Sequence, residues 1–218
     1  MKIAVIGAGG WVGGAIAREA LSRGIEVTAI GRDASKLEQV EGAVPVALDA
    51  TNLGQLTEAV SGHDAVVGSV VDRSTEDRSV LPAAARAAIE AVAGTDAGRI
   101  VWVGGGGSLN DPSGTPFVES PDFPAEYKAE SEAGYEALRV FRDAPENVDW
   151  AFLSPPVQDL HHGPKGEGEL VIQGGDEPVL ANGEPAGVSS GDLAVAVVDE
   201  VERPHFSRQR FTLGYAAG

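Results

Sequence analysis

The feature that most constrains this chain is a run of glycines between its first apolar segment and its first amphipathic segment. Residues 3–6 are apolar, residues 7–13 read GAGGWVG, and from Trp11 to Ser22 apolar side chains recur at helical spacing until Gly24. A strand, a glycine turn and a helix in this order present the free N–H groups of the helix start and the positive end of its dipole. We therefore expect a strand–turn–helix unit that can hold a pyrophosphate.

Each glycine has a physical use in such a turn. One permits the sharp bend, another lets the backbone approach a pyrophosphate, and a third allows the helix to pack closely on the strand. The strict G-x-G-x-x-G pattern fails because Val12 stands where its last glycine would fall, whereas G-x-x-G-x-x-G fits. Glycines can also mark turns only, but their place between a strand and a helix favours a dinucleotide site. Its predicted residues are Gly7, Gly9, Gly10, Trp11, Val12 and Gly13.

Apolar strands and helices alternate as far as Leu153. The predicted strands are 3–6, 26–30, 44–48, 65–71, 99–103 and 150–153, and the predicted helices are 11–22, 53–60, 82–92 and 126–142. Short apolar strands that alternate with helices are typical of a parallel sheet covered on both faces. The sequence predicts an α/β fold with a doubly wound parallel sheet, a Rossmann fold, in a single domain of residues 1–218.

From Ser154 the chain changes character. Residues 154–168 are rich in Pro, Gly and His and predict a long loop, followed by short strands at 169–173 and 178–181, a helix at 192–202 and a strand at 209–213. Ligands of doubly wound sheets bind outside the carboxyl ends of the strands. We therefore expect residues 154–218 to form a small substrate-covering rim.

Composition narrows the partners. The chain has 33 acidic and 16 basic residues, a formal charge of −17, and no cysteine, which removes disulfides and thiolate chemistry. A negative field repels nucleic acid and acidic membranes. No apolar run approaches the roughly 20 residues of a membrane span, and the first strand follows Met1 too closely for a signal peptide. We expect a cytoplasmic monomer or homodimer that acts on a small molecule, without nucleic acid or membrane as partner.

The end of the second strand bears on the choice of cofactor. An acidic residue there would bind the ribose 2′-hydroxyl of NAD, whereas a basic one accommodates the 2′-phosphate of NADP. Arg32 offers a planar fork for phosphate, and Lys36 adds a second charge. Asp33 keeps NAD possible, and the alternative role of the group is a solvated pair with Asp33 as a helix N-cap. NADP is the favoured prediction.

Five parts of the chain carry a resemblance to a known family: the glycine turn, Gly31-Arg32, and the segments 103–109 (VGGGGSL), 121–128 (PDFPAEYK) and 152–155 (FLSP). On these residues the chain resembles, over nearly its whole length, atypical short-chain dehydrogenase/reductases, and among them the NmrA-like, NAD(P)H-binding proteins of the NAD-dependent epimerase/dehydratase type. It implies strand order 3-2-1-4-5-6-7, a C-terminal substrate region and NADP preference. It also implies Asp49 and Ala50 near the adenine, Ser69 and Val70 near the nicotinamide ribose, and Gly104 at the cofactor.

The resemblance also brings catalytic candidates, with one departure. Members of the superfamily use a Tyr-x-x-x-Lys pair, in which lysine lowers the tyrosine pKa and tyrosine donates a proton while hydride arrives. Here Lys128 follows Tyr127 directly and position 131 is serine. Adjacent helical residues point about 100° apart, so they cannot act as that pair. Tyr135 and Arg139 have the right spacing, but arginine does not deprotonate.

Ser108, Tyr127 and Lys128 are thus the predicted catalytic residues, with a turn cap and helix-start roles as alternatives. The predicted function is an NADP(H)-dependent oxidoreductase that transfers hydride to a small carbonyl, quinone or flavin-like acceptor. The resemblance leaves a second class open: relatives include redox-sensing regulators that bind the cofactor without turnover.

Three further patterns favour structural roles. Residues 187–191 match G-x-S-x-G, but a turn precedes them where a hydrolase needs a strand, and Ser189-x-x-Asp192 reads as a helix capping box. The adjacent His161 and His162 point in different directions and have no third ligand nearby, so we expect no metal site. His63 and His205 are expected in surface turns.

Overall fold

The computed structural model describes residues 1–71, 77–157 and 159–217. At its centre lies an eight-stranded sheet with the order β3-β2-β1-β4-β5-β6-β12-β8. Its strands are β1 (Lys2–Ile6), β2 (Glu26–Gly31), β3 (Val44–Ala47), β4 (Ala65–Gly68), β5 (Arg99–Val103), β6 (Asp149–Ser154), β12 (Gln209–Tyr215) and β8 (Leu170–Gly174). All neighbours from β3 to β12 pair in parallel, and β8 is added antiparallel to β12.

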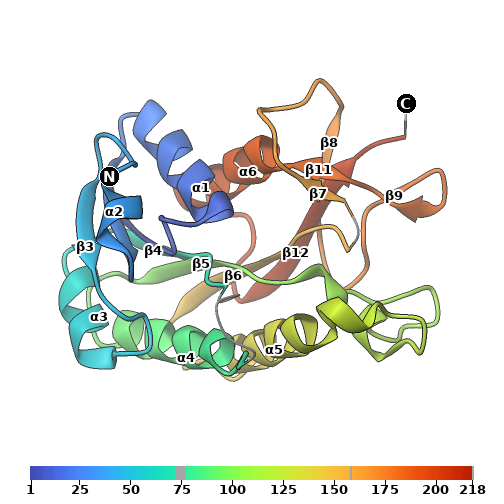
Figure 1. Cartoon of the computed structure of the whole chain (residues 1–218), viewed down its shortest axis with the longest axis horizontal. Coiled ribbons are helices and arrows are strands. Elements are labelled where there is room, and N and C mark those ends of the chain that lie inside the picture. Colours follow the sequence, from blue (N-terminus) through green and yellow to red (C-terminus); the bar gives the residue numbers. More distant parts are fainter. Residues whose placement is uncertain (72–76, 158, 218) are drawn as a thin grey trace.

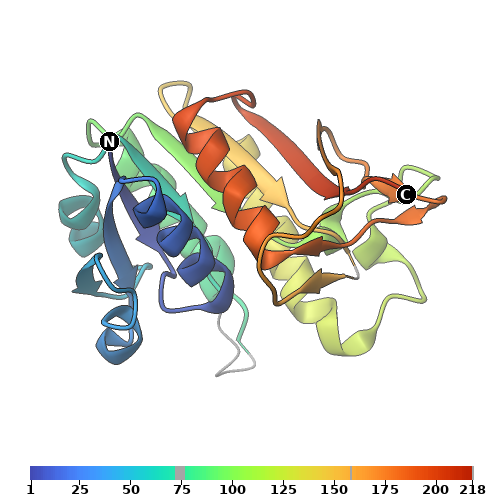
Figure 2. The same cartoon turned by 90° about the horizontal axis from the view of Figure 1, so that it is seen from above.

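The predicted doubly wound parallel sheet is confirmed. The seven parallel strands have the implied order 3-2-1-4-5-6-7, with β12 as the seventh, and β8 extends that order by one strand. Figure 1 shows the sheet between its helices, and Figure 2 shows the C-terminal strands continuing the sheet away from the N-terminal ones.

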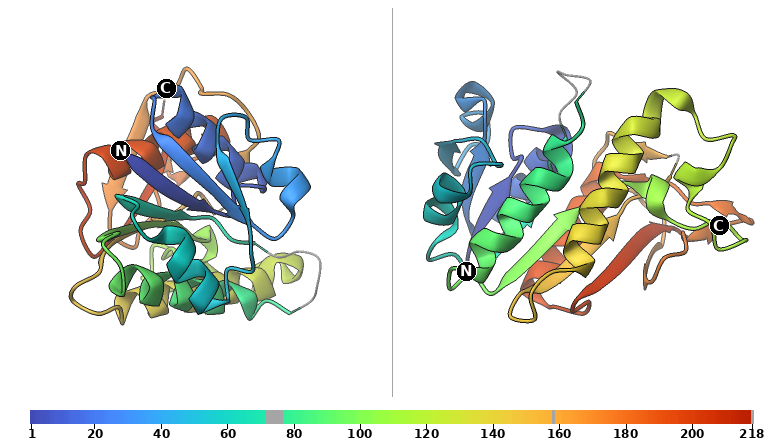
Figure 3. Two further views of the ribbon diagram at one scale, coloured as in Figure 1. Left: turned by 90° about the vertical axis from the view of Figure 1, so that its left-hand side faces the viewer. Right: turned by 90° about the horizontal axis from the view of Figure 1, so that it is seen from below.

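Helices cover both faces of the sheet. On one face α1 (Trp11–Ser22) packs beside α6 (Ser190–Glu202), and on the other α4 (Val80–Ala93) packs between α3 (Leu53–Val60) and α5 (Ala125–Arg142) (Figures 1 and 3). Strand β1 shows why both faces need cover: Ile3 and Val5 join the apolar cluster under α1 and α6, whereas Ala4 and Ile6 join the cluster under the other helices. Successive side chains of a strand point to opposite faces of the sheet, so a strand that is apolar at every position must be covered on both faces.

Most helices begin and end close to the sequence expectation. Asn52 caps α3 by accepting from the N–H of Gln55, and Ser189 caps α6 by accepting from the N–H of Asp192, as the predicted capping box requires. The four-residue α2 (Ala34–Leu37) was expected only in the alternative in which Asp33 caps a helix. None of the helices in the described ranges has the length and apolar composition that a membrane span requires.

Two expectations need correction. The strand predicted at 65–71 ends at Gly68, because its partner β1 ends at Ile6 and the chain then turns at Gly7. His63, expected in a surface turn, is buried: Nε2 lies 2.8 Å from the hydroxyl oxygen of Thr28, and Nδ1 lies 3.1 Å from the carbonyl oxygen of Val60.

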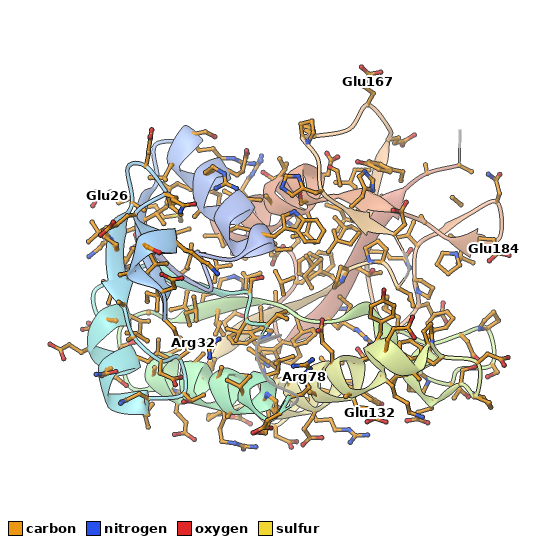
Figure 4. All side chains as sticks on the ribbon, viewed as in Figure 1. Glu26, Arg32, Arg78, Glu132, Glu167 and Glu184 are labelled. Carbon is orange, nitrogen blue, oxygen red and sulfur yellow. The ribbon has the colours of Figure 1, made fainter. Side chains whose placement is uncertain are left out.

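The segment after β6 combines short strands and turns. It holds β7 (Leu160–His161), which pairs with β11 (Val188–Ser189), and the hairpin of β9 (Leu180–Ala181) and β10 (Glu184–Pro185). Glu167 points away from the body of the molecule at the tip of this segment (Figure 4). Position 158 of the expected 154–168 loop lies outside the described residues.

Candidate functional site

The glycine turn after β1 is built so closely that side chains cannot replace two of its glycines. Gly7 has φ +86°, and a Cβ there would lie 2.0 Å from the carbonyl oxygen of Ser69. A Cβ on Gly13 would lie 2.2 Å from the carbonyl oxygen of Gly7. The N–H of Gly7 donates to Ile30 O (2.8 Å), which ties the turn to the end of β2. The backbone therefore approaches neighbouring carbonyl groups so closely at Gly7 and Gly13 that only glycine fits there.

Helix α1 begins directly at this turn. Gly14 is its first residue with an i→i−4 hydrogen bond, to Gly10 O (2.9 Å), so the N–H groups of Trp11, Val12 and Gly13 precede the helical ladder. These three residues line a large cavity. The helix start can therefore give its amides and its dipole to an anion, although the chain as a whole is acidic.

The end of β2 brings its charged residues to the same cavity. Arg32, Asp33 and Lys36 line it, and Figure 4 shows Arg32 extending from this part of the chain. Asp33 caps α2: its carboxylate accepts from the N–H (3.1 Å) and the hydroxyl (2.6 Å) of Ser35. The hydroxyl bond of Ser35 is the first cause that lowers the pKa of Asp33 below its ordinary value. The N-cap role considered for Asp33 is thus observed.

The cavity extends from the glycine turn after β1 to the opposite half of the molecule. Its volume is about 1410 Å³, beyond the roughly 300–1,000 Å³ of a pocket for one drug-sized ligand. It is lined by all the predicted cofactor residues: Gly7, Gly9, Gly10, Trp11, Val12, Gly13, Arg32, Lys36, Asp49, Ala50, Ser69, Val70 and Gly104. The cavity is therefore larger than a single small ligand requires.

The far half of the cavity is mainly apolar. Its walls come from η2 (Phe117–Glu119), the start of α5 and the residues after β6. The apolar lining residues there are Phe117, Phe123, Pro124, Tyr127, Pro155, Pro156, Val157 and Leu160, and the polar ones are Ser120, Asp122, Glu130 and Ser131. Rings, prolines and aliphatic side chains therefore make up most of this half. We call residues 117–131 and 155–160 the acceptor side, omitting position 158.

The three predicted catalytic residues lie in different environments. Tyr127 lines the cavity, with 58 % of its surface exposed. Lys128 is exposed but is not among the lining residues. Ser108, 2 % exposed, also does not line the cavity: its hydroxyl donates to Gly105 O (3.3 Å) and accepts from Arg210 Nη2 (2.5 Å). The structure therefore brings only Tyr127 to the cavity.

Ser131 is a cavity residue that the motif comparison passed over. It lies one helical turn after Tyr127, so that both line the cavity from one face of α5. A Cβ on Gly107 would lie 2.8 Å from the Cβ of Ser131, which places the serine against the glycine turn after β5. The spacing of the Tyr-x-x-x-Lys motif would have pointed to Ser131, because this serine stands four positions after Tyr127, where the motif has its lysine.

One aromatic contact joins the glycine turn after β1 to the segment after β6. The Trp11 indole stacks on the imidazole of His162, with ring centroids 5.6 Å apart and planes 10° apart. The segment that carries His162 is held at its other end, where Asp192 Oδ2 accepts from the N–H of Gly166 (2.7 Å) and the hydroxyl of Tyr215 (2.6 Å). The first turn of α1 is thereby in contact with the rim after β6.

This fold and this turn define the class of protein: a dinucleotide-binding protein with a Rossmann fold. The model of the NAD(P)H-binding family matches residues 7–204. The chain therefore belongs to the NAD(P)H-binding family, and the resemblance found in the sequence is confirmed at that level.

Relatives of known sequence or structure agree with this assignment. The chain is 34% identical over 217 residues to the uncharacterized protein YwnB of Bacillus subtilis (strain 168), with 98% of both chains covered. It is 30% identical to a protein of Streptococcus pneumoniae TIGR4 described as a candidate NADH-flavin reductase, with 99% of both chains covered and a TM-score of 0.87. It is 31% identical to a candidate epimerase from Bacteroides thetaiotaomicron, with 100% of this chain and 98% of that chain covered and a TM-score of 0.84.

Proposed function

We propose that this protein is an NADPH-dependent reductase that passes hydride to a small, flat, conjugated acceptor such as a quinone or a flavin. The observation that carries the proposal is the continuous cavity, with a pyrophosphate-binding turn at one end and the ring-lined acceptor side at the other. The likeness to a candidate NADH-flavin reductase supports an acceptor of this kind. We further propose that the acceptor is met in the cytoplasm and that the protein works as a monomer or homodimer.

The preference for NADPH rests on how the charges at the end of β2 are used. Asp33 already accepts two hydrogen bonds from Ser35 and caps α2, a role that competes with a ribose 2′-hydroxyl. Arg32 and Lys36 line the same end of the cavity, where a guanidinium fork and an ammonium group suit a phosphate. Phosphate binding by these two side chains therefore favours NADPH over NADH.

The bound nicotinamide would supply the hydride, and the chain would orient the acceptor and provide hydrogen bonds. We assign to Tyr127 the role of hydrogen-bond and proton donor to the acceptor, with Ser131 beside it on the same face of α5. Reduction of a quinone or flavin consumes one hydride and one proton, and the proton can come from Tyr127 or from water. Such acceptors need an acid less than ketones do, which suits a site without the Tyr-x-x-x-Lys lysine.

The remaining catalytic predictions take other roles in this proposal. Ser108 acts from behind the cavity wall, through the turn that carries Gly104–Gly107. The catalytic role of Lys128 stays a prediction. The position of Lys128 outside the cavity lining does not favour that role.

The test is an acceptor screen with purified protein. NADPH oxidation is followed with a flavin, a quinone and an aldehyde, each with and without protein. We expect faster turnover with the flavin or the quinone than with the aldehyde. Tight NADPH binding without turnover on any acceptor would contradict the reductase and favour the cofactor-binding sensor.

A further inference from the structure

A buried guanidinium lies behind the wall of the cavity. Arg210, on β12, is 4 % exposed, and each of its three nitrogens donates a hydrogen bond. Nε donates to Ser154 Oγ (2.9 Å), Nη1 to Asp176 Oδ1 (2.9 Å) and Nη2 to Ser108 Oγ (2.5 Å). These partners come from the end of β6, the turn after β8 and the turn after β5. One side chain thus joins three segments that are far apart in sequence.

The turn after β5 is the part of this group that reaches the cavity. Gly104 to Gly107 line it, and Ser108 follows them directly. The glycines have little room to move on the other sides: a Cβ on Gly104 would lie 2.1 Å from the Phe152 ring, and one on Gly106 would lie 2.5 Å from Pro155 O. The hydrogen bond from Arg210 to Ser108 fixes the end of this turn from behind.

Asp176 supplies the negative charge that makes the buried arginine tolerable. Its carboxylate accepts from Arg210 Nη1 and from Arg142 Nη2 (2.7 Å), and its backbone carbonyl accepts from the N–H of Asn110 (2.7 Å). Partial burial acts to raise the pKa of Asp176, but Arg210 and then Arg142 outweigh it, so the pKa of this carboxyl is lowered. A buried charge that loses its partner is strongly destabilising. Arg210 therefore depends on Asp176 for its position.

We propose that Asp176 and Arg210 are positioning residues for the acceptor, because they hold the Gly104–Ser108 turn in place through the hydroxyl of Ser108. This inference rests on the proposed function, since it places the turn, which begins at the predicted cofactor residue Gly104, where the nicotinamide would meet the acceptor. Neither residue lines the cavity. Their effect should fall mainly on the acceptor, because the turn that would hold the pyrophosphate, Gly7–Gly13, lies at the other end of the cavity and has no contact with Asp176 or Arg210.

The test uses Asp176→Asn and Ser108→Ala, because removal of Arg210 itself would leave unpaired polar groups in the core. Asp199→Asn is the matched control: Asp199 pairs with Arg23 on the outer side of α1 and α6, and its side chain is 38% exposed, against 42% for Asp176. Each variant is assayed for acceptor KM at saturating NADPH, for NADPH Kd by titration, and for hydrogen exchange of the amides of residues 104–110.

We expect Asp176→Asn and Ser108→Ala each to raise the acceptor KM by about 10-fold, since a misplacement of about 1 Å can cost up to about 100-fold. The NADPH Kd should stay within about 2-fold, and the amides of 104–110 should exchange about 10-fold faster. Both substitutions act through Arg210, so the double variant should be little worse than the worse single variant. Asp199→Asn should change none of these quantities.

Two results would overturn the proposal. In one, Asp176→Asn behaves like Asp199→Asn in both acceptor KM and exchange. In the other, it weakens NADPH as much as the acceptor, which indicates general loosening. If the wild type reduces no acceptor at all, the proposed function fails, whereas the exchange comparison still decides whether Asp176 holds the turn.

Discussion

The two halves of the cavity are made in different ways. The cofactor half is built mainly on consecutive residues, namely β1, the turn Gly7–Gly13 and the first turn of α1, and the residues after β2, β3 and β4 complete it. The acceptor half is assembled from η2, one face of α5 and the residues after β6, and Arg210 fixes one of its turns from a strand near the end of the chain. One half depends on local backbone geometry, and the other on contacts between distant segments.

The difference shows where specificity resides. Backbone amides and glycines can hold any pyrophosphate, so the cofactor half suits a whole family. The acceptor half is lined by side chains, so its substitutions change the ligand without changing the fold. Substitutions in the first half should therefore affect the cofactor, and those in the second half the acceptor.

Gly13→Ala should have the largest effect on the cofactor half. Its Cβ would lie 2.2 Å from Gly7 O, and overpacking costs about 1–3 kcal/mol, so NADPH affinity should fall by up to about 100-fold. Gly14→Ala is the control, since its Cβ would lie 3.1 Å from Ala8 O and next to the flexible end of Arg18. Calorimetric titration measures both variants. Equal losses would contradict the role given to the turn.

Arg32→Ala should separate the two cofactors. A hydrogen bond to a charged group contributes about 1.5–3 kcal/mol, so the Kd for NADPH should rise by about 10- to 100-fold while that for NADH changes by less than about 2-fold. Arg18→Ala, on the exposed side of α1 and outside the cavity lining, is the control. A similar loss for both cofactors in Arg32→Ala would refute the 2′-phosphate assignment.

Tyr127→Phe and Ser131→Ala should lower kcat with the acceptor by about 5- to 10-fold each, as expected for the loss of a hydrogen bond of about 1–1.5 kcal/mol. NADPH affinity should change little, because both residues line the acceptor side. Steady-state kinetics with the best acceptor of the screen measures this, with Glu126→Gln as control at the same helix start. Unchanged turnover in Tyr127→Phe would remove Tyr127 from the donor role, and Lys128→Gln in the same series tests the remaining sequence prediction.

The smallest effect concerns the stability of the strands that carry the cofactor half, where His63 lies between β2 and the start of β4. Burial, and then the charge of Lys2, lower the pKa of His63 below its ordinary value near 6.5. At a pH below this ordinary value, His63 is protonated more readily in the unfolded chain than in the folded chain. The contribution of His63 to the free energy of unfolding is therefore complete above this value and is lost as the pH falls below it. The slope cannot exceed about 1.4 kcal/mol per pH unit, because one proton is exchanged.

Denaturant unfolding of the wild type and of His63→Gln at several pH values tests the predicted direction of this pH dependence. The variant should be less stable at neutral pH and should lose less stability on acidification than the wild type. His161→Gln, which removes an exposed imidazole that has no contact with Thr28, is the matched control variant. Parallel slopes for the wild type and His63→Gln would contradict the assignment.

The same contrast explains what the sequence could predict. The parallel sheet and the glycine turn after β1 were predictable from the residues themselves, because they depend on apolar periodicity and on neighbouring residues. The strand order and the places of Asp49, Ala50, Ser69 and Val70 at the cavity followed only from the family resemblance. The buried place of His63 was missed, because its contact with Thr28 forms only when β2 and the residues before β4 come together.

The acceptor half was harder to predict. Tyr127 was found through a motif, but Ser131 was passed over because serine does not do the chemistry of lysine. Ser108 was expected at the cavity, yet its hydroxyl faces Arg210, which is 102 positions away in sequence. No local pattern signals a contact at that separation.

The most direct test of the account is hydrogen exchange of the wild type with and without NADPH. If one cavity runs from the dinucleotide turn to the acceptor side, the cofactor must slow exchange in two separate segments at once, residues 7–14 and residues 104–110. Protection of both segments is the predicted result. Protection of residues 7–14 alone would contradict the account, because the nicotinamide end would then lie away from the acceptor half.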